Sequence, residues 1–225
     1  KSPNKAPGPS GLSINAFKAA SPEALEILYG LTHSILSTLS PVEAWYEKLV
    51  ILLSKDRSLK PDKQRPISLL EVWRKLSSGL LLGKVKKLTD PNISELQFGF
   101  RENHSTEQPV SFLLGEIELS MESKSPLVII SLDIKKAFDS VTRPWIHTCG
   151  LAVGCNPEVL DWLISMDALG PCHISLEQGL KSGSSFPTVT GVPQGLVEGP
   201  SFWLWIINPL LLRLEEEAEK YDGLF

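Results

Sequence analysis

The sequence predicts an α+β fold, in which helices are mixed with antiparallel strands. Several segments have the apolar spacing of amphipathic helices and begin with capping residues. Other segments are short apolar runs bounded by Pro, Gly or Ser, which is typical of strands. The two kinds of segment are mixed along the 225 residues, and this favours the α+β class.

The N-terminal part is expected to contain helices and two extended segments after a Pro/Gly-rich arm. Ser21-Pro22-Glu23 begins a helix, with Ser as the N-cap and Pro at the first helical position. A capping box at 40–43 opens a short second helix. The apolar run 48–54 predicts a strand, which a polar turn and an extended segment follow. Residues 71–88 have a helical period. The apolar face of the first helix would consist of Leu25, Leu28, Leu31 and Ile35.

The C-terminal part adds further helices and strands. A helix is expected over 107–121, where Pro109 is compatible only with the first turn. The apolar run 127–133 predicts a fully buried strand, and Asn156-Pro157 begins another helix. Residues 173–191 contain two strand-like runs joined by a Gly/Ser turn, which is typical of a hairpin. The last predicted helix covers 200–219 and contains Pro209.

The strand predicted over 127–133 ends on a carboxylate, Asp133. A carboxylate at the exposed end of a buried strand is held rigidly and faces solvent, which suits a divalent-metal ligand. The alternative is a structural residue that caps the following helix. Asp139, six residues later, fits the structural role better.

Charge is distributed unevenly. Residues 1–104 carry 15 Lys and Arg against 10 Asp and Glu, whereas residues 105–225 carry 7 against 16. The basic residues concentrate in 48–87, with 11 against 3 acids. Such an asymmetry fits a lobe that grips a polyanion beside a lobe that binds metal, or two solvated surfaces of opposite sign.

Two classes of protein are disfavoured by composition. The chain has three cysteines without regular spacing, so no disulfide framework is expected. The most apolar stretch, 202–212, is interrupted by Asn208-Pro209 and is shorter than the roughly 20 residues that a membrane span needs. We therefore expect an intracellular protein without a membrane span.

Five motifs occur in an order that resembles the reverse transcriptases of non-LTR retrotransposons and related mobile elements. "KAPGPSG" (5–11) is similar to that family's Lys-Ala-Pro-Gly-Pro-Asp-Gly motif, and "LKPDKQRPISLL" (59–70) to its fingers motif. "QFGFRENHST" (97–106) and "SLDIKKAFDSV" (131–141) resemble the Gln-x-Gly-Phe-Arg segment and the first catalytic motif of the palm. "GVPQG" (191–195) resembles the later Gly-x-Pro-Gln-Gly motif.

The resemblance implies a right-hand polymerase fold, with a fingers-like basic region at 1–104 and a partial palm at 105–225. It also implies RNA-templated DNA synthesis by a two-metal mechanism, in which carboxylates hold Mg²⁺ ions. By this resemblance Asp133 would ligate metal, and the backbone carbonyl of Ile134 would add a ligand. Mg²⁺ is expected in an active full-length form and no cofactor on this chain alone.

The same resemblance assigns nucleotide-binding residues. Phe138 would lie under the deoxyribose and exclude a 2′-OH by its size. Arg65 and Lys55 would reach the triphosphate from the fingers. Gln194 and Gly195 would line the nucleotide and template pocket, where a side chain on the backbone would obstruct the base pair.

The sequence departs from the family pattern at several positions. The aromatic-x-Asp-Asp turn is absent, and Asp222 does not replace it. Ser10 stands where the family usually has Asp, and Gly150 stands where a helix former is expected.

Two functions therefore stay open for this chain. One is a segment of an RNA-directed DNA polymerase, with nucleic-acid partners and a nuclear location. The other is a domesticated remnant that acts as a structural subunit of an organelle or another large assembly. In the second case, partner proteins would cover the apolar helix at 201–214.

Overall fold

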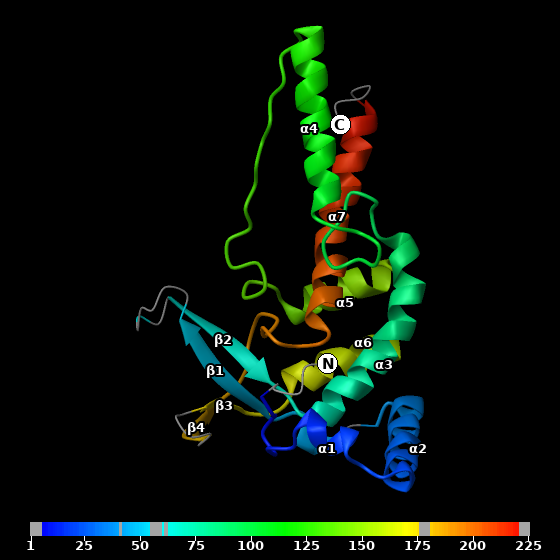
Figure 1. The fold of residues 1–225 in the computed structure, drawn as a ribbon, viewed down its shortest axis with the longest axis vertical. Coiled ribbons are helices and arrows are strands. Elements are labelled where there is room, and N and C mark those ends of the chain that lie inside the picture. Colours follow the sequence, from blue (N-terminus) through cyan, green and yellow to red (C-terminus); the bar gives the residue numbers. More distant parts are fainter. Residues whose placement is uncertain (1–5, 41, 55–59, 61–62, 176–180, 221–225) are drawn as a thin grey trace.

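The computed structural model describes residues 6–40, 42–54, 60, 63–175 and 181–220. Helices pack around one side of a small sheet, while α4 and the end of α7 extend away from it toward the same side of the molecule (Figure 1). The helices are α1 (Ile14–Lys18), α2 (Pro22–Thr38), α3 (Val72–Thr89), α4 (Glu107–Ser123), α5 (Arg143–Ala152), α6 (Pro157–Ala168) and α7 (Gly199–Lys220), with short 3₁₀ helices η1 (Glu43–Trp45) and η3 (Asp90–Asn92). The strands are β1 (Lys48–Ser54), β2 (Gln64–Leu69), β3 (Cys172–Ser175) and β4 (Lys181–Phe186).

The sheet has the strand order β2-β1-β3-β4. β1 pairs with β2 in antiparallel register, with Val50 opposite Ser68. β1 also pairs with β3, but in parallel, so the sheet is mixed and not wholly antiparallel as expected. β3 and β4 form the predicted antiparallel hairpin, and its turn at 176–180 lies outside the described residues. The sheet therefore joins strands from both halves of the chain.

The predicted helices with strong local start signals are confirmed. The hydroxyl of Ser21 accepts a hydrogen bond from the amide of Ala24 at the start of α2, and the side chain of Asn156 does the same for Val159 in α6. α3, α4 and α7 also form within a few residues of the predicted bounds. The short helix predicted after residue 40 is the 3₁₀ turn η1. α5 was not predicted.

The buried core lies where α3, α5, α6 and α7 meet. Gly150 in α5 explains one departure from the family pattern, because a Cβ there would lie 2.8 Å from a methyl group of Leu160 in α6. The close approach of the two helices thus requires glycine. Trp205 in α7 is buried and Trp203 is half-buried. Other side chains of this core are Leu82, Ile146, Cys149, Leu163, Met166 and Phe202.

The strand predicted over 127–133 is wrong. These residues form no regular structure, and Val128, Ile130 and Leu132 are 81%, 76% and 84% exposed. The segment runs outside the sheet as a long connection after α4 (Figure 1). A strand needs a neighbour to hydrogen-bond its backbone, and no described strand lies beside this segment.

Two helices that were expected to bury an apolar face, α2 and α7, leave part of that face exposed. In α2, Leu25 and Leu31 are exposed, and the helix contacts α3 through buried Thr32, whose hydroxyl accepts a hydrogen bond from the Trp73 indole. The first half of α7 is covered by this chain itself, while Leu210, Leu212 and Leu214 are exposed. A protein partner on this helix stays a prediction.

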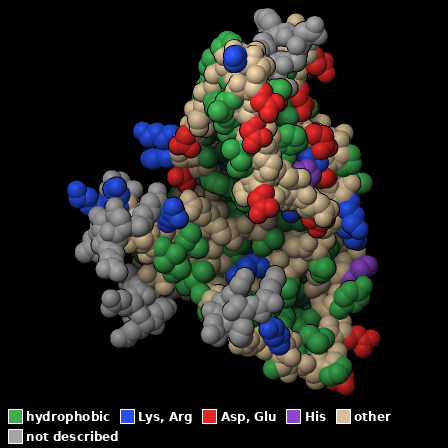
Figure 2. Space-filling model, turned by 45° about the horizontal axis from the view of Figure 1, so that its top comes forward, with side chains coloured by type: hydrophobic (Ala, Val, Ile, Leu, Met, Phe, Trp, Pro, Cys, Tyr) green, Lys and Arg blue, Asp and Glu red, His purple; other side chains and the backbone are tan. Residues whose placement is uncertain are grey.

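α4 has no buried residue. Its exposed apolar side chains share the upper part of the molecule with many acidic ones (Figure 2). This part contains the end of α7, where four of the six residues 215–220 are Glu. No helix in the described ranges is both long and apolar enough to cross a membrane.

Candidate active site

A cleft of about 330 Å³ lies on the sheet beside the Gly-x-Pro-Gln-Gly segment. β1, β2 and β3 provide its floor, and residues 190–194 provide one wall. Its polar lining residues include Ser68, Asp139 and Gln194. The other lining residues are Val50, Leu52, Pro66, Cys172, Ile174, Phe186, Thr188, Thr190, Gly191, Val192 and Pro193.

Backbone hydrogen bonds join three of the family-like motifs around this cleft. The amide of Ser68 in β2 donates to the carbonyl of Gln194 at 2.7 Å. The amide of Val192 donates to the carbonyl of Phe138 at 2.8 Å, and the amide of Gly191 donates to Val141 at the same distance. Segments 65–68, 138–141 and 191–195 are thus fixed to one another although they lie far apart in the sequence.

Gly195 is required by this arrangement. Its φ is +109°, a conformation that side-chain-bearing residues rarely adopt. A Cβ on Gly195 would overlap the carbonyl oxygen of Ser68 in β2. The motif's second glycine therefore allows the loop to lie directly on the sheet.

Of the predicted nucleotide-binding residues that the structure describes, Gln194 lines the cleft. Arg65 is exposed on β2, but successive side chains of a strand point to opposite faces, so Arg65 lies on the other face of the sheet from the lining residues Pro66 and Ser68. The ring of Phe138 packs on Trp203 of α7, with ring centroids 5.4 Å apart, and both side chains are half-buried. Lys55 lies outside the described residues.

The predicted metal ligands are not assembled in the cleft. Asp133 and Ile134 are exposed in the connection that precedes Phe138, and Asp139 lines the cleft instead. The part of the chain that the structure describes contains no group of three His, Cys, Asp or Glu side chains that could hold a metal ion. The described residues therefore do not fit a two-metal site in this arrangement.

Glu71, a residue that the sequence analysis did not single out, holds the N-terminal motif next to the C-terminal end of β2. The hydroxyl and the amide of Ser10 both donate to the Glu71 carboxylate, at 2.6 Å each. Glu71 is also the N-cap of α3 and is buried. A carboxylate at position 71 explains why a hydrogen-bond donor stands at position 10, because an Asp there would face another acid.

We expect Ser10→Asp to lower the free energy of unfolding by about 1–3 kcal/mol, since it replaces a hydrogen bond to a charged group with repulsion. Glu71→Gln in the same chain should restore most of this loss, because an amide can donate to the new carboxylate. Ser13→Asp is the control, since Ser13 is an N-cap without a side-chain cap bond and Asp is favourable there. Urea denaturation measures all three. Equal stability of Ser10→Asp and the parent would contradict the contact.

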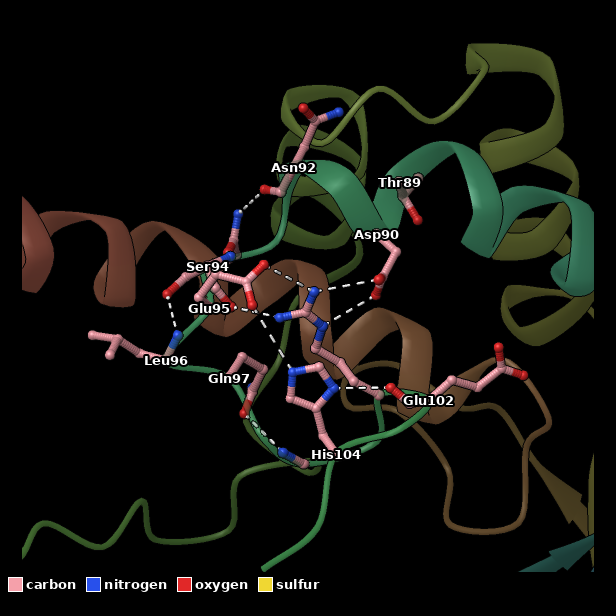
Figure 3. Close-up of polar contacts among 12 residues, drawn as sticks. Thr89, Asp90, Asn92, Ser94, Glu95, Leu96, Gln97, Glu102 and His104 are labelled. Carbon is pink, nitrogen blue, oxygen red and sulfur yellow. Dashed lines mark hydrogen bonds and ion pairs between the residues drawn. The ribbon is translucent and has the colours of Figure 1, made fainter. Parts of the chain in front are cut away.

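The Gln-x-Gly-Phe-Arg segment is anchored by a network of polar contacts (Figure 3). The guanidinium of Arg101, whose side chain is 4% exposed, lies between Asp90 at 3.2 Å and Glu95 at 3.5 Å. It also donates to the carbonyl of Ser94 at 3.0 Å. His104 lies 4.0 Å from the Glu95 carboxylate. Arg101 therefore connects the end of the loop 90–104 to its beginning.

The same loop is tied to α7. The amide of Ser94 donates to the side chain of Asn208 at 2.7 Å, and Asn208 in turn donates to the carbonyl of Asn92. The Ser94 hydroxyl donates to Glu215 at 2.7 Å. These contacts indicate a structural role for the motif, since the Arg101 guanidinium is committed to partners within the loop.

Sequence comparisons place the chain in a family. Residues 54–224 match the reverse transcriptase (RNA-dependent DNA polymerase) family. The chain is 30% identical over 207 residues to the RNA-directed DNA polymerase from mobile element jockey of Drosophila melanogaster, covering 88% of this chain and 22% of that protein. It is 29% identical over 218 residues to a retrovirus-related Pol polyprotein from a type-1 retrotransposable element of Bradysia coprophila, covering 93% and 21%.

A third relative is a probable RNA-directed DNA polymerase from transposon BS of Drosophila melanogaster, 27% identical over 207 residues, covering 87% of this chain and 22% of that protein. The chain thus spans about a fifth of the length of the curated relatives it matches. The matched segment contains four of the five motifs, three of which meet at the cleft. The chain is a reverse transcriptase-like segment and belongs to the reverse transcriptase family.

Proposed function

We propose that the chain supplies the fingers and part of the palm of an RNA-directed DNA polymerase, with residues 1–104 as the fingers-like basic region and 105–225 as the partial palm. One observation carries this proposal: three motif segments from distant parts of the sequence are hydrogen-bonded around one cleft. The cleft is lined by residues of the sheet, of the Gly-x-Pro-Gln-Gly loop and of the segment that contains Asp139, which suits a nucleotide held against a template. RNA template and DNA primer are the proposed partners.

The chain's own residues would bind and orient the incoming nucleotide. Arg65 is proposed to contact the triphosphate, since it is exposed on β2 and its guanidinium can donate two parallel hydrogen bonds to phosphate oxygens. Lys55 is proposed to add a second positive charge. Gln194, which lines the cleft, would contact the base pair. Gly195 is proposed to contribute to the same pocket by letting this loop lie directly on β2, since a Cβ there would overlap the Ser68 carbonyl.

Reverse transcriptases use Mg²⁺ in catalysis, and Asp133 with the Ile134 carbonyl is the proposed ligand pair in an active form. The described residues do not assemble a site for the ion. One carboxylate cannot organise two Mg²⁺ ions, so these 225 residues alone are not expected to extend a primer.

RNA-templated primer extension by the whole protein that contains this chain tests the proposal. We expect incorporation of dNTPs, and we expect Asp133→Asn to reduce it by at least about 10³-fold, as loss of a charge-stabilising group does. Asp161→Asn is the control, since the Asp161 side chain is 69% exposed on α6. Absence of incorporation by the whole protein, or full activity of Asp133→Asn, would refute the assignment.

Phe138 is proposed to exclude ribonucleotides, with its ring held in place by Trp203. In the active whole protein, Phe138→Ala should raise the ratio of rNTP to dNTP incorporation about 10-fold or more, since a steric exclusion of this kind is worth a few kcal/mol. Phe112→Ala, on the exposed face of α4, should leave the ratio unchanged. An unchanged ratio in Phe138→Ala would show that this ring is not the gate.

A further inference from the structure

Two charged side chains are buried between α3 and the start of α7. Arg74 lies in the first turn of α3, and Glu198 immediately precedes Gly199, the first residue of α7. Their side chains are 0% and 1% exposed. Arg74 Nη2 lies 3.9 Å from Glu198 Oε1, which is an ion-pair distance but too long for a hydrogen bond.

Three serine hydroxyls belong to the same two helix ends. Ser77 and Ser78 lie one turn after Arg74, and Ser201 lies three residues after Glu198, so each shares a helix face with one of the charges. All three are buried. Within the described part of the chain, their hydroxyls have no hydrogen-bond partner, and neither do Arg74 Nε, Arg74 Nη2 or the two carboxylate oxygens of Glu198.

Such a set of unpartnered groups is unstable in a dry interior. A buried polar group without a partner costs about 1–3 kcal/mol, and more if it is charged. Burial lowers the pKa of Arg74, while the attraction of Glu198 raises it. Arg74 Nη1 has its own partner, the carbonyl of Trp45 at 3.0 Å. The remaining donors and acceptors need partners that the described residues do not supply.

Internal water is the partner that fits this geometry. Buried waters typically make about three hydrogen bonds to polar groups that would otherwise be unsatisfied. At 3.9 Å the two charged groups are in the range in which a bridging water is to be considered, and such a bridge is enthalpically nearly as favourable as a direct hydrogen bond. The cluster offers donors from the guanidinium, acceptors from the carboxylate, and hydroxyls that act as either.

Glu198 is also the end of a functional segment. Loop 191–198 runs from the Gly-x-Pro-Gln-Gly motif to α7, and its first part is bonded to Ser68, Phe138 and Val141. Its last residue, Glu198, forms an ion pair with Arg74 of α3. We propose that internal water bridges Arg74 and Glu198, and that this hydrated ion pair holds loop 191–198 against helix α3.

Arg74 and Glu198 are thus positioning residues, which act on the cleft through the loop. Their importance for nucleotide binding rests on the proposed function. The hydration of the ion pair and its hold on loop 191–198 do not rest on the proposed function. They are therefore tested by ordered water and by amide exchange, and not by polymerase activity.

A high-resolution crystal structure of the protein tests the water site. We expect at least one ordered water within hydrogen-bond distance of both the Arg74 guanidinium and the Glu198 carboxylate, with further contacts to the serine hydroxyls. A direct, dry bidentate contact between the two side chains would overturn the proposal.

Hydrogen exchange tests the hold on the loop. In Glu198→Gln, amides in 191–198 should exchange at least about 10-fold faster than in the parent, because the buried guanidinium loses its counter-charge. Glu215→Gln is the matched control, a half-buried carboxylate of the same helix that contacts Ser94. It should loosen the loop near Ser94 and leave 191–198 unchanged.

The double variant Arg74→Met/Glu198→Met separates positioning from general stability. Apolar replacement of a buried ion pair is often tolerated, so this variant should fold, yet its loop should still exchange faster than that of the parent. Wild-type protection of the loop in either Glu198→Gln or the double variant would overturn the proposal. If neither variant folds, the crystal structure alone decides.

Discussion

Lys48→Met is expected to lower the free energy of unfolding by about 3–5 kcal/mol, the typical cost of removing one partner from a buried ion pair. Lys48 begins β1 and is fully buried. Its ammonium donates to the backbone carbonyl of Asp167 and lies 3.3 Å from that residue's carboxylate, whose side chain is 4% exposed. Without Lys48, Asp167 would keep its ion pair with Arg143, at the longer distance of 3.7 Å.

The loss is large relative to the total stability of a domain, which is about 5–15 kcal/mol. Urea denaturation of the parent, of Lys48→Met and of a double variant measures this loss. Lys48→Met/Asp167→Leu should recover most of the loss, because no uncompensated charge then stays buried. Lys84→Met, at an exposed position of α3, should change stability by less than about 0.5 kcal/mol. A loss in the double variant as great as in Lys48→Met would contradict this account.

The pH dependence of Lys48→Met gives an independent check. Burial raises the pKa of Asp167, and attraction to Lys48 is the main effect that opposes the rise. Removing Lys48 should raise this pKa further. A carboxyl group whose pKa is higher in the folded state favours folding at low pH, and this contribution is lost as the pH rises through the folded-state pKa. The deficit of Lys48→Met should therefore shrink as the pH falls from 8 to 5, and the double variant should not show this trend.

The sequence predicted most helices because their start signals are local. Ser21 and Asn156 each cap a helix from within the same few residues. The strand predicted over 127–133 failed for the opposite reason, since an apolar run cannot indicate whether a neighbouring strand is present to pair with it. Asp133 was expected at the end of this strand. It is exposed, but it lies in an unpaired connection and is not among the residues that line the cleft.

The site was partly predictable. Gln194 and Gly195 were identified from their motif, and the structure places them against β2. Glu71 and Glu198 were missed because their partners are distant in sequence, 61 residues away in the case of Ser10 and Glu71. A lone Glu beside a helix start carries no local signal of burial. Only the fold shows that each of these acids is buried next to a donor.

Gly195→Ala is expected to detach the Gly-x-Pro-Gln-Gly loop from the sheet. A side chain at a positive φ costs about 1–2 kcal/mol, and the Cβ at this position would overlap the Ser68 carbonyl of β2. Ser68 is held in register with Val50 of β1, so the strand cannot move away easily. The loop must shift instead, and the hydrogen bond from the Ser68 amide to Gln194 is then lost. We expect a loss of about 2–4 kcal/mol in unfolding free energy.

The effect on activity should be greater than the effect on stability. If the whole protein is a polymerase, a shift of about 1 Å in this loop should reduce primer extension about 100-fold, as misplacement of a binding group does. Gly115→Ala is a control of opposite sign, since Gly115 lies inside α4 with open space around its Cβ position, and alanine there should stabilise the helix by up to about 1 kcal/mol. Gly195→Ala with the stability and activity of the parent would mean that the loop does not rest on β2. In that case the cleft between these two segments would not be the nucleotide site.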